Sequence, residues 1–222
     1  MLYIVPTPIG NIEDITLRAI RVLKEVDVIL AEDTRTSGKL LKHYEITTPM
    51  RSYHAFNEHK TVNELVEQLK VGTDMALVSD AGTPGISDPG FLLIREAIKA
   101  NIEVICLPGA TAVIPALVKS GLPCDKYFYE GFLPHKKGRR TRWEFIASSP
   151  VTVVLYESPH RIEKCIKEII TYCGADRPCA IVREISKVYE EAIRGNASDV
   201  LKEVQNRKLK GEMVIVIGAN TA

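Results

Sequence analysis

Short apolar runs alternate with segments of helical spacing along the first half of the chain. Apolar runs predict strands at residues 2–6, 26–31, 50–53, 75–78 and 102–107. Apolar positions three and four apart predict helices at residues 17–26 (capped by Asp14 or Thr16), 37–43, 61–70, 91–98 and 113–120. Strands that alternate with helices indicate an α/β fold with a mostly parallel sheet.

Residues 121–125 interrupt this pattern, so we predict two domains of similar size, 1–121 and 122–222. In the second domain, strands are predicted at residues 126–130, 152–156, 179–184, 191–194 and 212–218, and helices at 161–172 and 197–205. The pattern there predicts another α/β domain with a mixed sheet.

Four polar loops follow predicted strands of the first domain, at residues 6–11, 32–35, 79–90 and 108–112. The carboxyl ends of parallel strands meet at one edge of a sheet, where ligands bind. The loop at 79–90 contains three glycines, two prolines and two aspartates. Glycine lets a ligand approach the backbone, and proline pre-forms the loop. Each loop alone is typical of a connecting turn, but together they predict a ligand pocket.

Composition and charge narrow the class of protein. The chain has 222 residues, 45% hydrophobic and 26% charged, with a net charge of +1. These values are typical of a soluble globular protein, and any binding of nucleic acid must depend on local basic clusters. The chain contains no apolar run of membrane-spanning length, and residues 1–5 lack a basic signal-peptide region. Five cysteines without a C-x-x-C pair indicate reduced thiols in a cytoplasmic protein.

Several ligand classes find little support in the motifs. The chain has neither the G-x-x-x-x-G-K-[ST] nor the G-x-G-x-x-G phosphate loop. The run from Gly82 to Gly85 has no cation beside it, so it suits a neutral or zwitterionic ligand. His54 and His59 do not match zinc-binding spacing, and we expect no metal.

Two motifs resemble those of the tetrapyrrole methylase superfamily. Gly82-Thr83-Pro84-Gly85-Ile86 resembles its G-D-P-G-I cofactor loop, with threonine where aspartate is usual, and residues 108–112 resemble its P-G-x-S/T-A signature. Residues 5–12, 31–35, 52–54, 156–161 and 183–187 resemble one branch, the ribosomal RNA small-subunit methyltransferase I group. The resemblance extends from residue 3 to about 218.

The resemblance implies a function and a set of contacts. Its members bind S-adenosylmethionine in a cleft between two α/β domains, and this branch methylates the 2'-hydroxyl of a cytidine in the decoding region of 16S rRNA. The substrate would be this rRNA, within the small ribosomal subunit, and the enzyme a homodimer. The implied cofactor contacts are Pro8, Asp80, Ala81, Gly82, Ile86, Thr111, Ala112, Phe132, Tyr156, Val182 and Met213.

A ribose hydroxyl needs a base or strong local polarisation before it attacks a methyl group. We hypothesise that Glu32 or Asp33, paired with Arg35, lies where the acceptor enters. The alternative is a structural ion pair at the end of a strand.

The segment at residues 135–143 is strongly basic and ends in the only tryptophan. Such a run is usually a solvated loop or helix face. With the resemblance, we predict that it binds RNA phosphates and that Trp143 is available for stacking. The predicted RNA contacts are Lys136, Lys137, Arg139, Arg140 and Arg142.

Two alternative functions remain open from the sequence. The same fold could methylate a tetrapyrrole or another small molecule, whose carboxylates the basic segment could also bind. A non-catalytic ribosome-assembly module is the other alternative.

Overall fold

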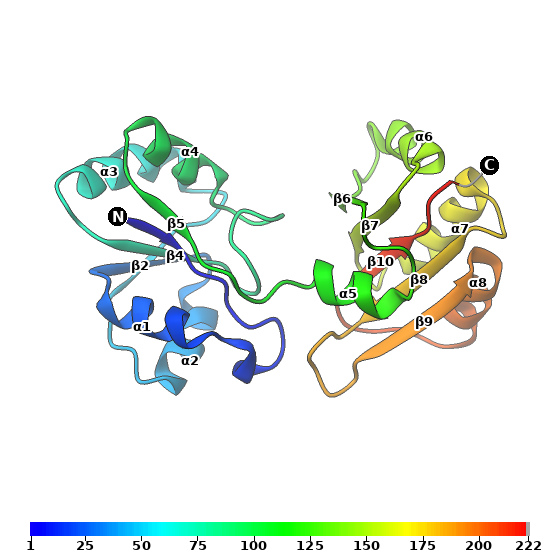
Figure 1. Cartoon of the computed structure of the whole chain (residues 1–222), viewed down its shortest axis with the longest axis horizontal. Helices are drawn as coiled ribbons and strands as arrows, with labels where there is room; N and C mark the ends of the chain where they lie inside the picture. The colour runs from blue at the N-terminus through cyan, green and yellow to red at the C-terminus, as the bar shows by residue number, and fades with distance from the viewer. Residues whose placement is uncertain (221–222) are drawn as a thin grey trace. The chain divides into compact units, whose positions relative to one another are not determined.

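The computed structural model describes residues 1–220 and contains two compact units, Met1–Thr111 and one that begins at Ala112 (Figure 1). The sequence placed the boundary ten residues later, after Gly121. The difference is helix α5 (Val113–Ser120), which packs against strands β8 (Pro178–Arg183) and β10 (Met213–Ile217) of the second unit. Its residues Val113, Ala116 and Leu117 are buried, so the helix belongs with the second sheet.

The first unit contains the parallel sheet that the sequence predicts. Its strands lie in the order β3-β2-β4-β1-β5, and every neighbouring pair is parallel. Their bounds are β1 Leu2–Ile4, β2 Val28–Ala31, β3 Met50–Ser52, β4 Met75–Val78 and β5 Val104–Cys106. All of their carboxyl ends therefore reach the same edge.

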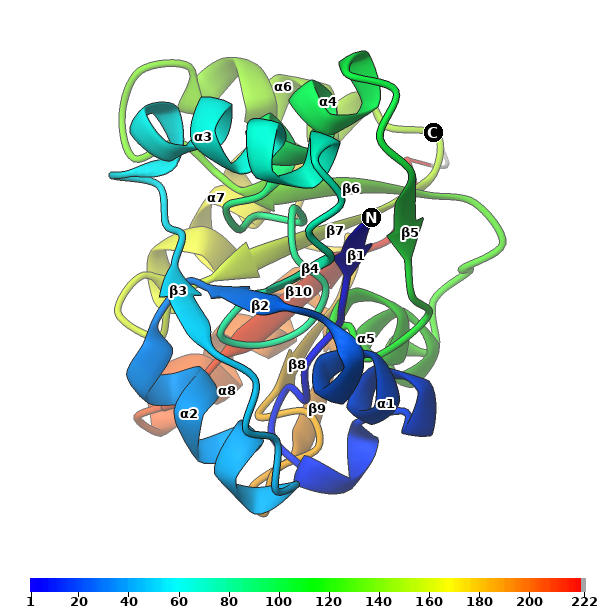
Figure 2. The same cartoon turned by 90° about the vertical axis from the view of Figure 1, so that its left-hand side faces the viewer.

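Helices cover both faces of this sheet (Figure 2). They are α1 (Leu17–Glu25), α2 (Thr34–His43), α3 (Glu58–Lys70) and α4 (Phe91–Lys99), with a short 3-10 helix η1 (Ile12–Asp14) before α1. Leu30 and Leu77 pack with α3 and α4, whereas Ile29 and Val78 pack with α1 and α2. Successive residues of a strand point to opposite faces, which explains why the central strands are apolar throughout.

Of the two caps considered for α1, the structure uses Thr16. Its Oγ1 accepts a hydrogen bond from the backbone N–H of Ala19 at 3.0 Å. This bond satisfies a donor that the first helical turn leaves without a partner.

The second unit contains the expected mixed sheet, in the order β6-β7-β10-β8-β9. Its remaining strands are β6 Tyr127–Phe132, β7 Thr152–Glu157 and β9 Glu191–Asn196. Among the strands described up to residue 220, only β6 and β7 of this sheet pair in parallel. Helices α6 (Arg139–Ser148), α7 (Ile162–Cys173) and α8 (Ala197–Asn206) share one apolar core with the sheet, and α5 contacts it separately.

None of the helices within residues 1–220 has both the length and the apolarity that a membrane crossing requires.

Candidate active site

The loops at the carboxyl edge of the first sheet are joined to one another, as the sequence predicts. Thr7 and Gly82 exchange two backbone hydrogen bonds of 2.9 Å, which connects the loop after β1 to the loop after β4. Thr83 Oγ1 donates to the carbonyl oxygen of Ala110 at 3.1 Å, which adds the loop after β5. Segments about 30 and 75 residues apart in sequence therefore form one connected surface.

Two glycines allow the close approaches within this surface. A Cβ atom on Gly109 would lie 2.6 Å from Cβ of Pro6, well inside van der Waals contact. Gly90 has φ +143° and begins α4, and a Cβ there would lie 2.9 Å from Leu77 Cδ2. The three loops can pack this tightly because side chains are missing at these positions.

The loop after β2 joins the same surface through Asp80. The backbone N–H of Asp33 donates to Asp80 Oδ1 at 3.1 Å. Burial raises the pKa of Glu32, and the nearby charge of Asp80 raises it further. The pKa of Asp88 rises to about 6, first through burial and then through the charges of Glu32 and Asp80. The charge of Asp80 therefore raises the pKa values of two neighbouring carboxyl groups at this edge.

Asp33 has a different environment from Glu32. It caps α2, where its Oδ1 accepts from the backbone N–H of Arg35 at 2.8 Å, and its Oδ2 accepts from the guanidinium of Arg35 at 2.7 Å. Hydrogen bonds from the Arg35 side chain and backbone lower the pKa of Asp33 to about 2. Such a carboxylate is a weak base, so the geometry favours the structural alternative for the Asp33–Arg35 pair.

Sequence reasoning did not include Asp88 among the site residues. The polar loop at 79–90 was visible in the sequence, but the burial that changes the proton affinity of Asp88 depends on the folded loop.

The cofactor residues expected from the predicted first domain, residues 1–121, lie along the connected loops. Asp80 and Ala81 are exposed, and Ile86 is 46% exposed. Gly82 is buried, has φ +80° and forms the isolated β-bridge with Thr7. The partly exposed members of the set are Pro8, Thr111 and Ala112.

The cofactor residues expected from the second unit divide between the two faces of its sheet. Phe132 pairs in register with Tyr156, and their ring centroids lie 5.4 Å apart. Tyr156 and Val182 are both opposite Val214, so these side chains share a face. Met213 is one residue away and lies in the apolar core with α6, α7 and α8. The pair most accessible to a ligand is therefore Phe132, which is 56% exposed, and the partly exposed Tyr156.

The basic segment comprises a turn at residues 135–138 and the start of helix α6 from Arg139. Lys136, Lys137 and Arg140 are exposed, although Arg140 contacts Glu144 one turn later at 2.7 Å. Arg142 donates to Glu130 Oε1 at 2.6 Å. Fewer basic side chains of this segment are therefore available to a ligand than the sequence indicates.

Trp143 and Arg139 lie in the interior of the second unit. Trp143 has no exposed surface and stacks on Tyr172 with a centroid distance of 6.1 Å. The prediction that Trp143 is available for stacking on RNA is therefore wrong, because the helix turns this ring into the core. Arg139 is 6% exposed and donates to Glu168 Oε1 at 2.9 Å.

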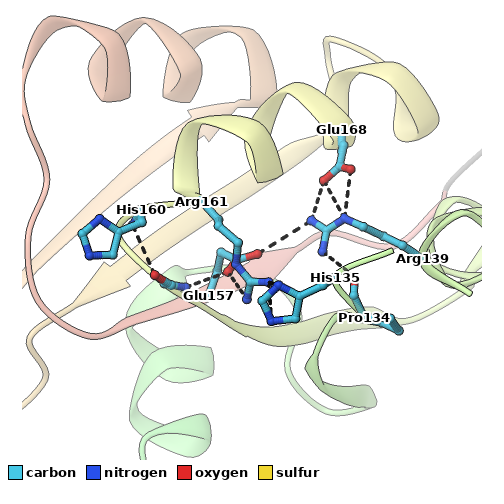
Figure 3. A network of polar contacts seen from close by, with 8 residues as sticks. Pro134, His135, Arg139, Glu157, His160, Arg161 and Glu168 are labelled. Carbon is cyan, nitrogen blue, oxygen red and sulfur yellow. Dashed lines mark hydrogen bonds and ion pairs between the residues drawn. The ribbon is translucent and has the colours of Figure 1, made fainter. Parts of the chain in front are cut away.

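Arg139 belongs to a charge chain that runs from Arg139 through Glu157 and Arg161 to His135 (Figure 3). Its guanidinium lies 3.7 Å from Glu157 Oε2, and the other carboxylate oxygen of Glu157 pairs with Arg161 at 2.8 Å. Arg161 in turn donates to a ring nitrogen of His135 at 2.9 Å. The side chain of Glu157 has no exposed surface, so the two arginines offset its buried charge.

Comparisons with known proteins place the chain among methyltransferases. Residues 1–201 match the family model for tetrapyrrole (corrin/porphyrin) methylases. The chain is 46% identical over its full length to the ribosomal RNA small subunit methyltransferase I of Synechocystis sp., and covers 80% of that protein. It is 45% identical to the protein of the same name from Escherichia coli O157:H7, over 100% of this chain and 78% of that one.

Solved structures share the fold. Diphthine synthase superposes with a TM-score of 0.75 at 14% identity, over 99% of this chain and 90% of the other. Uroporphyrin-III C-methyltransferase from Thermus thermophilus, complexed with S-adenyl homocysteine, gives a TM-score of 0.66 at 18% identity, over 98% and 96% of the two chains.

Proposed function

The chain belongs to the tetrapyrrole (corrin/porphyrin) methylase family, and we propose that it methylates the 2'-hydroxyl of a cytidine in the decoding region of 16S rRNA. It is a methyltransferase, and its methyl donor is S-adenosylmethionine. Support for the RNA acceptor comes from relatives of 46% and 45% identity that are named as small-subunit rRNA methyltransferases.

The proposed donor site lies at the connected loops along the carboxyl edge of the first sheet. The negative charges of Glu32, Asp80 and Asp88 favour a cationic ligand, and the donor is a sulfonium. Exposed Ile86 offers an apolar contact beside backbone groups that glycine leaves open. When bound, the donor supplies an electrophilic methyl group.

The full set of proposed donor contacts keeps the residues that the resemblance implies. They are Pro8, Asp80, Ala81, Gly82, Ile86, Thr111, Ala112, Phe132, Tyr156, Val182 and Met213. Among them, Met213 is only 3% exposed, so it would line the site from its buried side.

Glu32 is the residue proposed to accept the proton of the ribose hydroxyl. A base works best when its pKa approaches the working pH, and burial moves the pKa of Glu32 in that direction. The pKa of Asp33 moves in the opposite direction, so this residue would position α2 and Arg35 instead.

The exposed amino groups of Lys136 and Lys137, with Arg140, are proposed to bind RNA phosphates. Arg139 and Arg142 are occupied by carboxylates and would support this surface from below. Because the proposed substrate is rRNA, we also propose that the enzyme acts in the cytoplasm, on the small ribosomal subunit and as a homodimer.

Labelled S-adenosylmethionine tests the proposal when it is offered with three acceptors in parallel: isolated small ribosomal subunits, protein-free 16S rRNA and a tetrapyrrole precursor. We expect label in the RNA, recovered as 2'-O-methylcytidine after nuclease digestion. Label in the tetrapyrrole alone would contradict the acceptor and leave the donor site standing. The absence of label from all three would contradict both.

A further inference from the structure

The loops that follow β6 and β7 line an open pocket of about 660 Å³ in the second unit. This volume lies within the range of roughly 300–1,000 Å³ that is usual for small-ligand sites. Its lining residues are Phe132, Leu133, Pro134, His135, Ser158, His160 and Arg161. Three of these residues are apolar, the other four carry polar groups, and none of the seven is acidic.

The buried carboxylate of Glu157 holds the guanidinium of Arg161 in position. Glu157 Oε1 accepts from Arg161 at 2.8 Å and also from the backbone N–H of Ser158 at 2.7 Å. Arg161 is 22% exposed, whereas the carboxylate behind it has no exposed surface. A guanidinium has five N–H donors, so its contacts with Glu157 and His135 leave donors for an oxygen that enters the pocket.

His135 and His160 contribute from the two loops, and both are exposed. Because a guanidinium only donates, the nitrogen of His135 that lies 2.9 Å from Arg161 acts as an acceptor. The second ring nitrogen, Nε2, lies 3.2 Å from the same guanidinium nitrogen, so the ring packs closely against Arg161. Figure 3 shows the ring of His135 beside Arg161, at the end of the charge chain.

Helix α7 adds a further positive contribution. Arg161 occupies its N-cap position, and no side chain there caps the first turn. The N–H groups of a first helical turn carry partial positive charge and favour anions. The guanidinium and the start of a twelve-residue helix therefore lie at the same wall of the pocket.

We propose that this pocket binds a phosphodiester group of the rRNA strand, with the adjoining sugar beside Pro134. Lys136 and Lys137 follow His135 directly and are exposed, so a polyanionic strand can continue from the pocket onto the start of α6. The charge of these neighbours favours an extended strand over an isolated phosphate. This inference rests on the proposed function and adds a specific binding position to it.

The direct test measures the affinity of the full chain for a fluorescently labelled RNA fragment of the decoding region, at several salt concentrations. Arg161→Gln should weaken binding about tenfold, and the slope of log K against log salt should fall by about 0.7–0.9, the value for one phosphate contact. His135→Ala should weaken binding about threefold with the salt slope unchanged. Arg21→Gln, which removes an exposed arginine paired with Glu25, is the matched control and should bind as the wild type does.

Arg161→Gln leaves Glu157 without its closest cation, so thermal unfolding is measured for each variant. If that variant fails to fold, Glu157→Gln/Arg161→Gln removes both charges and takes its place. Unchanged RNA affinity and salt slope in a folded variant would overturn the inference. A loss of S-adenosylhomocysteine affinity without a loss of RNA affinity would also overturn it, because the pocket would then serve the donor.

The wild-type protein separates this inference from the proposed function. If the wild type methylates the RNA and the pocket variants bind RNA normally, only the pocket assignment fails. If the wild type does not methylate RNA at all, the proposed function fails first.

Discussion

Asp33 and Asp80, 47 residues apart, are joined by a hydrogen bond from the backbone N–H of Asp33 to Oδ1 of Asp80 at 3.1 Å. The bond connects the ends of two neighbouring parallel strands, β2 and β4. It holds Asp80 where its charge raises the pKa values of both Glu32 and Asp88. The backbone of Asp33 thus helps to set the pKa of its neighbour Glu32, because it positions Asp80.

Glu32 and Asp33 can be separated by conservative amide substitutions. Glu32→Gln should reduce kcat about 100-fold or more, since general-base catalysis contributes about 10²–10⁴-fold. Asp33→Asn should keep kcat within a few-fold of the wild type, because asparagine also caps helices. Single-turnover methylation with saturating donor measures both rates. A larger loss for Asp33→Asn than for Glu32→Gln would reverse the two assignments.

The raised pKa of Asp88 should make the stability of the protein depend on pH. Its folded-state pKa of about 6 exceeds the ordinary value of 3.8, so the folded state retains a proton that the unfolded chain releases. The contribution of Asp88 to stability is therefore favourable at low pH and is lost as the pH rises from about 4 to about 6.

Asp88→Asn removes this charge and should stabilise the protein at pH 7.5. The full shift corresponds to about 3 kcal/mol, and solvent screening of a half-buried group reduces the expected gain to about 1 kcal/mol. Urea unfolding at pH 7.5 and pH 4 measures the difference, which should vanish at the lower pH. An equal gain at both values would show that the ionisation of Asp88 is not responsible.

Gly90 and Gly72 allow the tight packing below the 79–90 loop to be measured. Both have positive φ, +143° and +100°, but a Cβ at Gly90 would meet Leu77 at 2.9 Å, whereas nothing lies within 4 Å at Gly72. Gly90→Ala should therefore cost about 2 kcal/mol more unfolding free energy than Gly72→Ala, the usual size of an overpacking effect. Similar losses in urea unfolding would show that the loop yields to the added methyl group.

The sequence predicted the parallel sheet and the polar loops at its carboxyl edge well, because both depend on local patterns. The central strands are apolar on both faces, and the polar residues begin where each strand ends. Helix α6 was missed for a physical reason. Its buried positions are Arg139, Trp143 and Ile146, so an arginine occupies an inward position that a periodicity search expects to be apolar. The carboxylates that make this burial possible, Glu157 and Glu168, are distant in the sequence.

The same limit applies to charge at the candidate site. The sequence shows that Glu32 and Asp33 are adjacent, but their pKa values move in opposite directions because one is partly buried and the other caps a helix. Only the folded arrangement distinguishes them.

Substitutions of Arg139 and of the exposed lysines should have different effects, the first on stability and the second on RNA binding. Arg139→Gln removes a buried cation from Glu168 and Glu157 and should destabilise the protein by about 3 kcal/mol. Lys136→Gln/Lys137→Gln should leave stability unchanged and reduce the salt dependence of RNA binding. Urea unfolding and RNA titration are performed on both variants. A reduced salt slope for Arg139→Gln with normal stability would assign this arginine to the RNA instead.

Isothermal titration with S-adenosylhomocysteine, the demethylated donor, tests the donor site most directly. The variants to compare are Gly82→Ala and Gly121→Ala, whose glycines have similar φ values of +80° and +73°, while only Gly82 lies in the bridge to Thr7. We expect the wild type and Gly121→Ala to bind one ligand per chain, and Gly82→Ala to bind at least tenfold more weakly while still folded. No heat of binding from folded wild-type protein, or full affinity in Gly82→Ala, would contradict a donor site at the carboxyl edge of the first sheet.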